Sequence, residues 1–357
     1  MLNKIIQTGK YEIWKAQREA NRKRHPLTYL FWEISLQCNF HCRHCGSYCE
    51  RHKYPDDLNT EEIKKVFKEI AEDFNAKKIT IAVTGGEPLL RKDLFEVMTY
   101  ARNLGFHWGM VTNGWFVTPE IVKKMKQSGM ETVVVSIDGL GLTHDKFRDM
   151  PGAYDQAIRA VKLLSKGKFL KDLQITTSVH KKCLPELEKM SKIFPKLGIN
   201  SWRVMNVDPI GRADIDQEIL LSKPELIQLL DFIKEKRKIS KIDITYSCAQ
   251  FLGFDYDDSV RDHPFFCATG INVASILHNG DIFVCPNVPR LPKLIQGNVK
   301  KERFSDVWNN KFEMFRDINR TNCAKCTNCP DWEYCLGGSY HLWDQKKKRP
   351  KSCYRSN

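Results

Sequence analysis

Three cysteines near the N-terminus have a spacing that suits a metal cluster. Cys38, Cys42 and Cys45 form C-x3-C-x2-C directly after the apolar run LTYLFWEIS. A cubane iron–sulfur cluster takes four ligands, so three thiolates leave one iron open. An open position on a catalytic metal is where a substrate or cofactor binds. The spacing therefore predicts a reactive cluster whose last ligand is not protein.

Zinc is the alternative metal for the same cysteine ligands. Structural zinc sites usually combine C-x2-C pairs with a second pair or with histidines, and His41, His44 and His52 lie close by in the sequence. Short cysteine patterns also arise by chance in a chain that has 13 cysteines. The choice between iron and zinc depends on the motifs that follow.

A glycine-rich segment comes next along the chain. Residues 84–88 read TGGEP, and Gly85 and Gly86 would let a ligand approach the backbone because neither has a Cβ. Glu87 offers an acceptor for an ammonium group. This segment is a candidate binding site for an amine-bearing ligand.

Two further polar segments stand at the carboxyl ends of predicted strands. Asn113 belongs to a TNG turn. Period-two alternation puts Ser136 and Asp138 of the segment SIDG on one face of a strand, where both can point toward a polar ligand such as a ribose. These residues extend the candidate site.

Alternating elements predict how these segments come together. Strand candidates cover residues 27–35, 78–83, 106–111, 132–137, 173–179 and 202–207, and helical periodicity covers 60–74, 92–104, 119–128, 153–165 and 184–197. This alternation predicts an α/β fold with a parallel sheet of six strands, a partial (β/α)6 TIM-like barrel. Chemistry in such folds lies at the carboxyl ends of the strands. The cysteine cluster, TGGEP, TNG and SIDG all fall there.

The last third of the chain carries eight of the cysteines. Cys267 and Cys285 flank an expected hairpin whose turn, residues 278–281, contains the Asn-Gly signal, so the two thiols would approach each other. The remaining candidate ligands are Cys323, Cys326, Cys329, Cys335 and Cys353. Small regions of this kind usually need a metal to fold. Zinc and iron both suit these ligands taken alone.

The motifs together resemble those of radical SAM enzymes. The similarity covers WEISLQCNFHCRHCG, the GGE segment, TNG and SIDGLGLTHDKFRDMPGAYDQA. It implies a [4Fe–4S] cluster on the first three cysteines, which binds S-adenosylmethionine (SAM) through its amino and carboxylate groups. One-electron cleavage of SAM then gives a 5′-deoxyadenosyl radical that abstracts a hydrogen atom. The resemblance implies that the GGE segment binds the amino group, that Arg148 is a candidate for the carboxylate, and that His44 lies near the adenine.

The C-terminal region, with GNVKKERFSDVW and CAKCTNCPDWEYC, resembles the SPASM domain, which holds two auxiliary [4Fe–4S] clusters in radical SAM enzymes that modify peptides and proteins. The resemblance assigns one cluster to Cys326, Cys329, Cys335 and Cys353. The other has Cys267, Cys285 and either Cys323 or Cys248, and its fourth ligand is open. Ser339 stands where the family usually has a cysteine, and His341 is another donor.

The resemblance divides the chain into an N-terminal helical arm (1–27), a radical SAM partial barrel (28–212), a connecting helix (213–242) and a SPASM domain (243–357). Cys49 and Cys183 fall outside the ligand sets. Each is either a small buried hydrophobe or, near a radical, a hydrogen-atom donor.

Composition bounds the location and partners. The N-terminus lacks a secretion signal and no segment approaches a membrane span, so we expect a cytoplasmic protein in which cysteines bind metals rather than form disulfides. The net charge is +14, with basic runs at 22–24 and 346–351 that we interpret as solvated surface, so nucleic acid is not an expected partner.

The substrate hypothesis rests on analogy with the family. A ribosomal peptide or protein is the leading substrate, with a reductant such as flavodoxin or ferredoxin as electron donor. Only 37 residues precede Cys38, so a separate peptide-recognition protein would be a further partner. Pro286 replaces the acid that sulfatase-maturing relatives carry, which argues against that activity. The alternatives are a small metabolite or tetrapyrrole substrate, and a non-catalytic zinc-binding interaction protein.

Overall fold

The structure is a computed structural model that describes residues 2–247 and 249–355, with side chains from residue 9 onward. Its main feature is one sheet of ten strands in the order β10-β9-β8-β1-β2-β3-β4-β5-β6-β7. Strands β1 to β7 are parallel neighbours, and β8 pairs parallel with β1. The two edges, β10 and β7, do not pair, so the sheet is an open, partial barrel rather than a closed one.

The six predicted strands are all present. They are β1 (Tyr29–Glu33), β2 (Thr80–Thr84), β3 (His107–Thr112), β4 (Thr132–Ser136), β5 (Asp172–Val179) and β6 (Ser201–Asn206). The count of six was wrong for the sheet as a whole, because β7 (Asp243–Tyr246), β8 (Val273–Ile276), β9 (Asp281–Phe283) and β10 (Gly297–Asn298) extend it. These added strands are two to four residues long, which is too short for a periodic apolar pattern to reveal.

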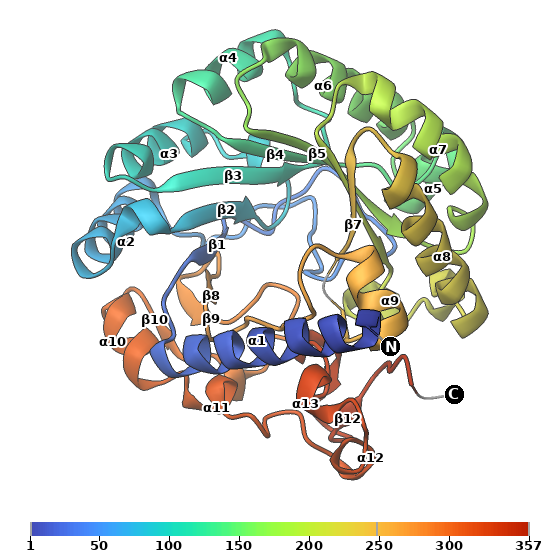
Figure 1. Cartoon of the computed structure of the whole chain (residues 1–357). Coiled ribbons are helices and arrows are strands. Elements are labelled where there is room, and N and C mark those ends of the chain that lie inside the picture. Colours follow the sequence, from blue (N-terminus) through green and yellow to red (C-terminus); the bar gives the residue numbers. More distant parts are fainter. Residues whose placement is uncertain (1, 248, 356–357) are drawn as a thin grey trace.

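Helices cover the outer face of the sheet, as Figure 1 shows. They are α2 (Thr60–Asp73), α3 (Leu94–Asn103), α4 (Pro119–Gln127), α5 (Leu142–Arg148), α6 (Ala153–Gly167), α7 (Leu187–Ile193) and α8 (Lys223–Ile239). Local signals fix their starts: Asn59 and Glu62 form a capping box for α2, and Ser222 and Glu225 form one for α8. Between helices and sheet lies a core that includes the fully buried Trp32, Trp108 and Trp202.

The C-terminal third is built onto the first strand. The predicted hairpin is present as antiparallel β8 and β9, and Tyr29 of β1 aligns with Val273 of β8. One hydrophobic cluster contains buried residues from both parts of the chain, from Leu27 to Leu342. The expected boundary near residue 243 therefore falls inside a continuous sheet and a continuous core. The short helices α9 (Gly253–Val260), α10 (Phe304–Asn310), α11 (Glu313–Arg316), α12 (Ala324–Thr327) and α13 (Trp332–Cys335) surround this region, and β11 (Trp343–Asp344) pairs with β12 (Arg349–Pro350).

Helix α1 (Leu2–Arg24) crosses the C-terminal third, where Figure 1 draws it beside α11 and α13. Tyr11 is fully buried against Phe251 and Phe265. The guanidinium of Arg18 donates to the carbonyl oxygens of Glu333 and Tyr334, at 2.6 and 3.1 Å. The N-terminal helix is thus packed on the protein rather than extended into solvent. Within the described residues, no helix is long and apolar enough to cross a membrane.

Candidate active site

A cavity of about 270 Å³ opens at the carboxyl ends of the strands. The last residues of β2 to β6 contribute to its wall, and the loop after β1 brings all three cysteines of the first motif to it. Of the predicted site residues, those that line the cavity are Cys38, Cys42, His44, Cys45, Gly85, Gly86, Glu87, Asn113, Ser136 and Arg148. The structure thus gathers segments that lie more than one hundred residues apart. Asp138 is the one predicted residue of this set outside the lining.

The two glycines after β2 hold the cysteine loop close. The amide of Gly86 donates to the carbonyl oxygen of Ser35 at 2.7 Å, and the amide of Glu87 donates to that of Gln37 at 2.9 Å. A Cβ on Gly86 would lie 1.9 Å from the oxygen of Gln37, and one on Gly85, whose φ is +113°, would lie 2.3 Å from that of Ser35. We predicted that these glycines make room for a ligand, but the space they leave is filled by the protein's own backbone.

Arg212 holds the cysteine loop from the other side. Its backbone amide donates to the carbonyl oxygen of Cys45 at 3.1 Å. The guanidinium donates to the carbonyl oxygens of Cys42, at 3.3 Å, and Cys49, at 2.7 Å, and pairs with Glu50 at 2.6 Å. Sequence reasoning missed this residue. It belongs to a short segment after β6, so the same strand-end rule that identified TGGEP would have found it there.

Glu87 is buried and keeps one acceptor position free. Its Oε1 accepts hydrogen bonds from the Thr112 hydroxyl and the Leu89 amide, at 2.8 and 3.2 Å. Within the described residues, Oε2 accepts only the Asn113 amide, at 2.8 Å. A carboxylate oxygen accepts two hydrogen bonds. Burial raises the pKa of Glu87 to about 7. A positively charged amine that completes this oxygen would favour the ionised form.

Asp138 lies behind the cavity wall and orients Arg148. Its Oδ2 accepts from the Arg148 Nε at 2.6 Å, and its Oδ1 accepts from the Ser178 amide at 2.7 Å. Burial acts to raise the pKa of Asp138, but the Arg148 charge and the surrounding histidines hold it below its usual value. Arg148 in turn reaches the Cys42 sulfur, 3.8 Å away. Direct ribose binding by Asp138 stays a prediction.

His44 belongs to a stack of three rings. It lies 4.4 Å from Phe147 at an interplanar angle of 9°, and Phe147 lies 3.9 Å from His180. Burial lowers the pKa of His44 to about 3, so the ring is neutral near pH 7. Its Nδ1 is buried without a hydrogen-bond partner among the described residues. Adenine stacking stays a prediction, because one ring face already packs on Phe147.

The remaining predicted residues of this site also contact protein. The Asn113 side chain donates to Asn39 of the cysteine loop at 2.8 Å and accepts from the Trp115 amide at 2.9 Å. Ser136, at the end of β4, is buried in the cavity wall. Cys49 lines the cavity too, and its hydrogen bond lowers the pKa of Cys45 to about 5, which favours the thiolate that binds metals. Cys183 lies instead in the core beside Met190.

The C-terminal cysteines divide into those on a groove and those off it. A groove of about 1120 Å³ is lined by Cys326, Cys329, Cys335 and Cys353. Cys323 stands beside this set, its sulfur 3.4 Å from that of Cys326. The Cys267 sulfur accepts the Tyr340 amide at 3.4 Å, and Cys285 follows β9. Whether these form two clusters stays a prediction.

Ser339, which stands where the family usually has a cysteine, and His341, the other possible donor, lie in different surroundings. Ser339 is buried, and its hydroxyl has no hydrogen-bond partner among the described residues. The His341 Nε2 lies 3.0 Å from a carboxylate oxygen of Asp208. Cys248, our other candidate, lies outside the described residues.

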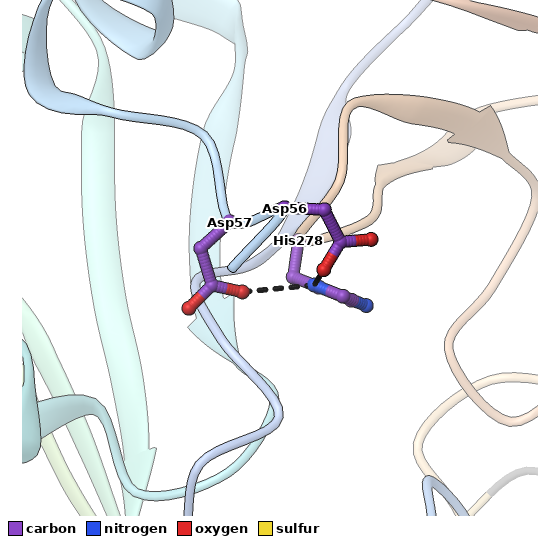
Figure 2. A group of neighbouring side chains, drawn as sticks. All are labelled: Asp56, Asp57 and His278. Atoms are coloured by element: carbon purple, nitrogen blue, oxygen red, sulfur yellow. Dashed lines mark hydrogen bonds and ion pairs between the residues drawn. The ribbon is translucent and has the colours of Figure 1, made fainter. Parts of the chain in front are cut away.

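A third group of potential ligands lies where the cysteine loop meets the C-terminal hairpin. Among the described residues, the only three ligand atoms within 4.8 Å of one another belong to Asp56, Asp57 and His278 (Figure 2). The His278 Nδ1 lies 2.8 Å from Asp57, and the Leu58 amide donates to the His278 carbonyl oxygen at 2.7 Å. These contacts tie the segment after the cluster motif to the β8–β9 turn.

The donor set of the main cavity fits an iron–sulfur cluster and SAM. Three thiols line one cavity, which is the ligand count of a cubane with one open iron. The free acceptor position on Glu87 and the guanidinium of Arg148 match an amine and a carboxylate on the same ligand.

Comparison with known proteins agrees with this geometry. A family model described as the radical SAM superfamily matches residues 32–180, and one for the SPASM iron–sulfur cluster-binding domain matches residues 267–330. The chain is 31% identical to an AdoMet-dependent heme synthase of Methanosarcina barkeri, over 91% of this chain and 95% of that protein. These matches define a SAM-dependent iron–sulfur enzyme. The chain belongs to the radical SAM superfamily and carries a SPASM domain.

Other relatives differ in what they act on. The chain is 32% identical to a pre-heme d1 synthase of Dinoroseobacter shibae (88% of this chain, 82% of that one) and 27% identical to the mycofactocin maturase of Mycolicibacterium smegmatis (87% and 77%). Among solved structures, Streptococcus suis SuiB bound to S-adenosylmethionine superposes with a TM-score of 0.72 at 15% identity, covering 95% of this chain and 80% of that one. That likeness shows the fold alone.

Proposed function

We propose that this protein abstracts a hydrogen atom from a tetrapyrrole that carries carboxylate side chains. The radical SAM chemistry follows from the family, and the substrate class is the new element. It is carried by one observation: the chain aligns over about nine-tenths of its length with two relatives named for heme and pre-heme d1 synthesis, at 31% and 32% identity. From the sequence alone we favoured a peptide substrate. Because of these two relatives, we now rank a tetrapyrrole before a peptide.

The protein's own residues would bind, orient and shield the reactants. Cys38, Cys42 and Cys45 would hold the cluster, and Arg212 keeps their loop in place. Glu87 and Arg148 would hold the amine and carboxylate of SAM. When bound and reduced by one electron, the cluster and SAM supply a 5′-deoxyadenosyl radical for hydrogen-atom abstraction. Thr112 and Ser136, buried in the cavity wall at the ends of β3 and β4, would help to shield a reactive species from water.

The test is anaerobic turnover with defined tetrapyrroles. The reconstituted enzyme is incubated with SAM, a chemical reductant and an iron coproporphyrin deuterated on its side chains. We expect 5′-deoxyadenosine to form faster with the porphyrin than without it, to carry deuterium, and to accompany a mass change in the porphyrin. Cys42→Ala is the matched control. Equal 5′-deoxyadenosine formation with and without the porphyrin, and no deuterium transfer, would contradict the proposal.

A ribosomal peptide is the second candidate, favoured by the similarity to a mycofactocin maturase over 87% of this chain. On this alternative a separate recognition protein and a flavodoxin or ferredoxin would be the partners. Co-expression without oxygen beside neighbouring small open reading frames, followed by mass spectrometry of the peptides, tests it. A peptide whose mass changes only with an intact Cys42 would favour this candidate.

A further inference from the structure

The groove lined by the C-terminal cysteines lies beside the reaction cavity. Pro209 lines the groove, while its chain neighbours Asp208 and Ile210 line the cavity. Likewise Pro289 lines the groove and Asn287 lines the cavity. An eight-atom cubane would fill only a small part of about 1120 Å³. The remaining space is a candidate site for part of a substrate, next to the cavity that holds the cysteine loop.

The groove has a strongly positive wall. Six basic and three acidic side chains line it. Two of the acids neutralise a base, since Asp214 pairs with Lys351 at 2.8 Å and Asp331 with Arg355 at 2.5 Å. The third acid, Asp344, accepts the backbone amides of residues 346 and 347 and so shapes their turn. Of the six bases that line the groove, four have no carboxylate partner among the described residues: Lys325, Lys346, Lys347 and Arg349.

The same groove offers apolar surface and an unused donor. Trp332 lines it with a partly exposed ring, and the buried Phe251 and Trp343 lie in the same wall, so a flat apolar ring can pack against Trp332. The side-chain nitrogen of Gln345, another lining residue, is buried without a hydrogen-bond partner among the described residues. Unpaired buried donors are uncommon in native proteins, and this one lies in the wall of the groove. Aromatic surface beside unpaired cations suits a flat molecule with acidic substituents.

We propose that this groove binds the carboxylate side chains of the substrate, with Lys346, Lys347 and Arg349 as the anion-binding residues. The inference rests on the proposed tetrapyrrole substrate and assigns it a site. Lys346 and Lys347 belong to the exposed turn between β11 and β12, and Arg349 is the exposed first residue of β12. The flat macrocycle would pack on Trp332, and its acidic arms would meet the basic turn. Charged and aromatic contacts would thus orient the substrate beside the cavity.

The test is porphyrin binding to the reconstituted holoenzyme. We compare the native protein with the triple variant Lys346→Glu, Lys347→Glu, Arg349→Glu, and titrate metal-free coproporphyrin against tryptophan fluorescence. We expect at least tenfold weaker binding in the triple variant. The matched control is Lys68→Glu, Lys123→Glu, Lys126→Glu, which makes the same charge change at exposed positions of α2 and α4 and should bind as the native protein does. Binding to the native protein should also weaken with salt.

Other outcomes overturn the inference. Equal porphyrin affinity in the groove variant and the native protein would exclude this turn as the site, as would equal losses in both triple variants. Tight binding of a glutamate-rich peptide with no binding of porphyrin would overturn the tetrapyrrole assignment. Slow SAM cleavage without substrate should be unchanged in the control variant, and the circular dichroism of the groove variant should match that of the native protein, which shows that it is folded. Porphyrin that binds through the turn without being turned over would support the groove and count against the proposed function alone.

Discussion

Asp138 and Arg148 form a buried ion pair, with 2.6 Å between the carboxylate oxygen and the guanidinium Nε. The carboxylate is fully buried and takes no part in the cavity lining, whereas Arg148 lines the cavity and lies 3.8 Å from the Cys42 sulfur. A planar guanidinium can serve both partners at once, and a lysine ammonium cannot do so with the same geometry. The pair therefore aims a fixed positive charge at the place where SAM and cluster would meet.

Replacement of Arg148 by lysine should weaken SAM binding about tenfold, which corresponds to about 1.4 kcal/mol. The lysine would keep the charge but lose the simultaneous contact with Asp138 and Cys42. The measurement is the SAM-induced change in the electron paramagnetic resonance spectrum of the reduced cluster, titrated with SAM. Arg159→Lys, an exposed arginine on α6, is the control. Equal SAM affinity in both variants would show that Arg148 does not contact the ligand.

Arg212→Ala should destabilise the protein by roughly 2 kcal/mol, because it removes the three hydrogen bonds of a half-buried guanidinium. Urea unfolding of the cluster-free protein measures this, and reconstituted Arg212→Ala should also hold less iron. Arg43→Ala is the matched control, since Arg43 has one ion-pair partner, Asp216, and is 39% exposed. A loss no larger than that of the control would mean that the cysteine loop does not depend on Arg212.

Gly86→Ala should prevent stable loading of the first cluster. The new methyl group would lie 1.9 Å from the Gln37 oxygen, so the cysteine loop would have to move. We expect destabilisation of about 3 kcal/mol and loss of the iron bound by the first motif. Gly9→Ala on α1 is the control, because nothing in the described part of the chain lies within 4 Å of its added Cβ. That variant should be as stable as the native protein or slightly more so.

Cys42→Ala should remove one cluster and leave the others. If all three predicted cubanes form, the native chain holds about twelve irons and the variant about eight. SAM cleavage should be lost. Iron and acid-labile sulfide analysis beside 5′-deoxyadenosine assays measures both effects. Continued 5′-deoxyadenosine formation would show that the reactive cluster lies elsewhere, and a native iron content suited to one cubane would refute the auxiliary clusters.

Asp73→Asn should weaken the joint between α2 and the C-terminal third. Asp73 accepts two hydrogen bonds from Arg303, at 2.7 and 2.9 Å, and one from Ser305 at 2.6 Å. The Arg303 contact lowers the pKa of Asp73 below 3.8. This stabilisation is therefore present above pH 3.8 and is lost as the pH falls through the lower pKa of the folded state.

The expected loss at pH 7 is about 1 kcal/mol, since the pair is partly exposed but bidentate. The difference between variant and native protein should shrink toward zero in acid. Urea unfolding at several pH values measures it, with Glu120→Gln, from an exposed pair on α4, as the control. A difference that stays constant down to acid pH would mean that the Asp73 charge contributes nothing.

Much of the fold and site could be predicted because each depends on local pattern. The six central strands have enough residues for periodicity, and the strand-end rule then places TGGEP, TNG and SIDG together. The Asn-Gly turn predicted the β8–β9 hairpin, but not its place in the sheet, because its partner β1 is far away in sequence. The strands β7 and β10 could not be predicted, because two to four residues carry no period. The role of Gly86 was misjudged for a related reason. A glycine leaves room, but only the packed structure shows that the Gln37 carbonyl fills that room.

The pairing of Val273 with Tyr29 sets an order of events during synthesis. The outer edge of the first strand stays open on the ribosome until 244 further residues have been made. Open strand edges are sites of aggregation in incomplete chains. In a nascent chain, the cysteine loop therefore follows a strand that is paired on one side only. Iron delivered before the last third of the chain has docked would reach an incomplete site.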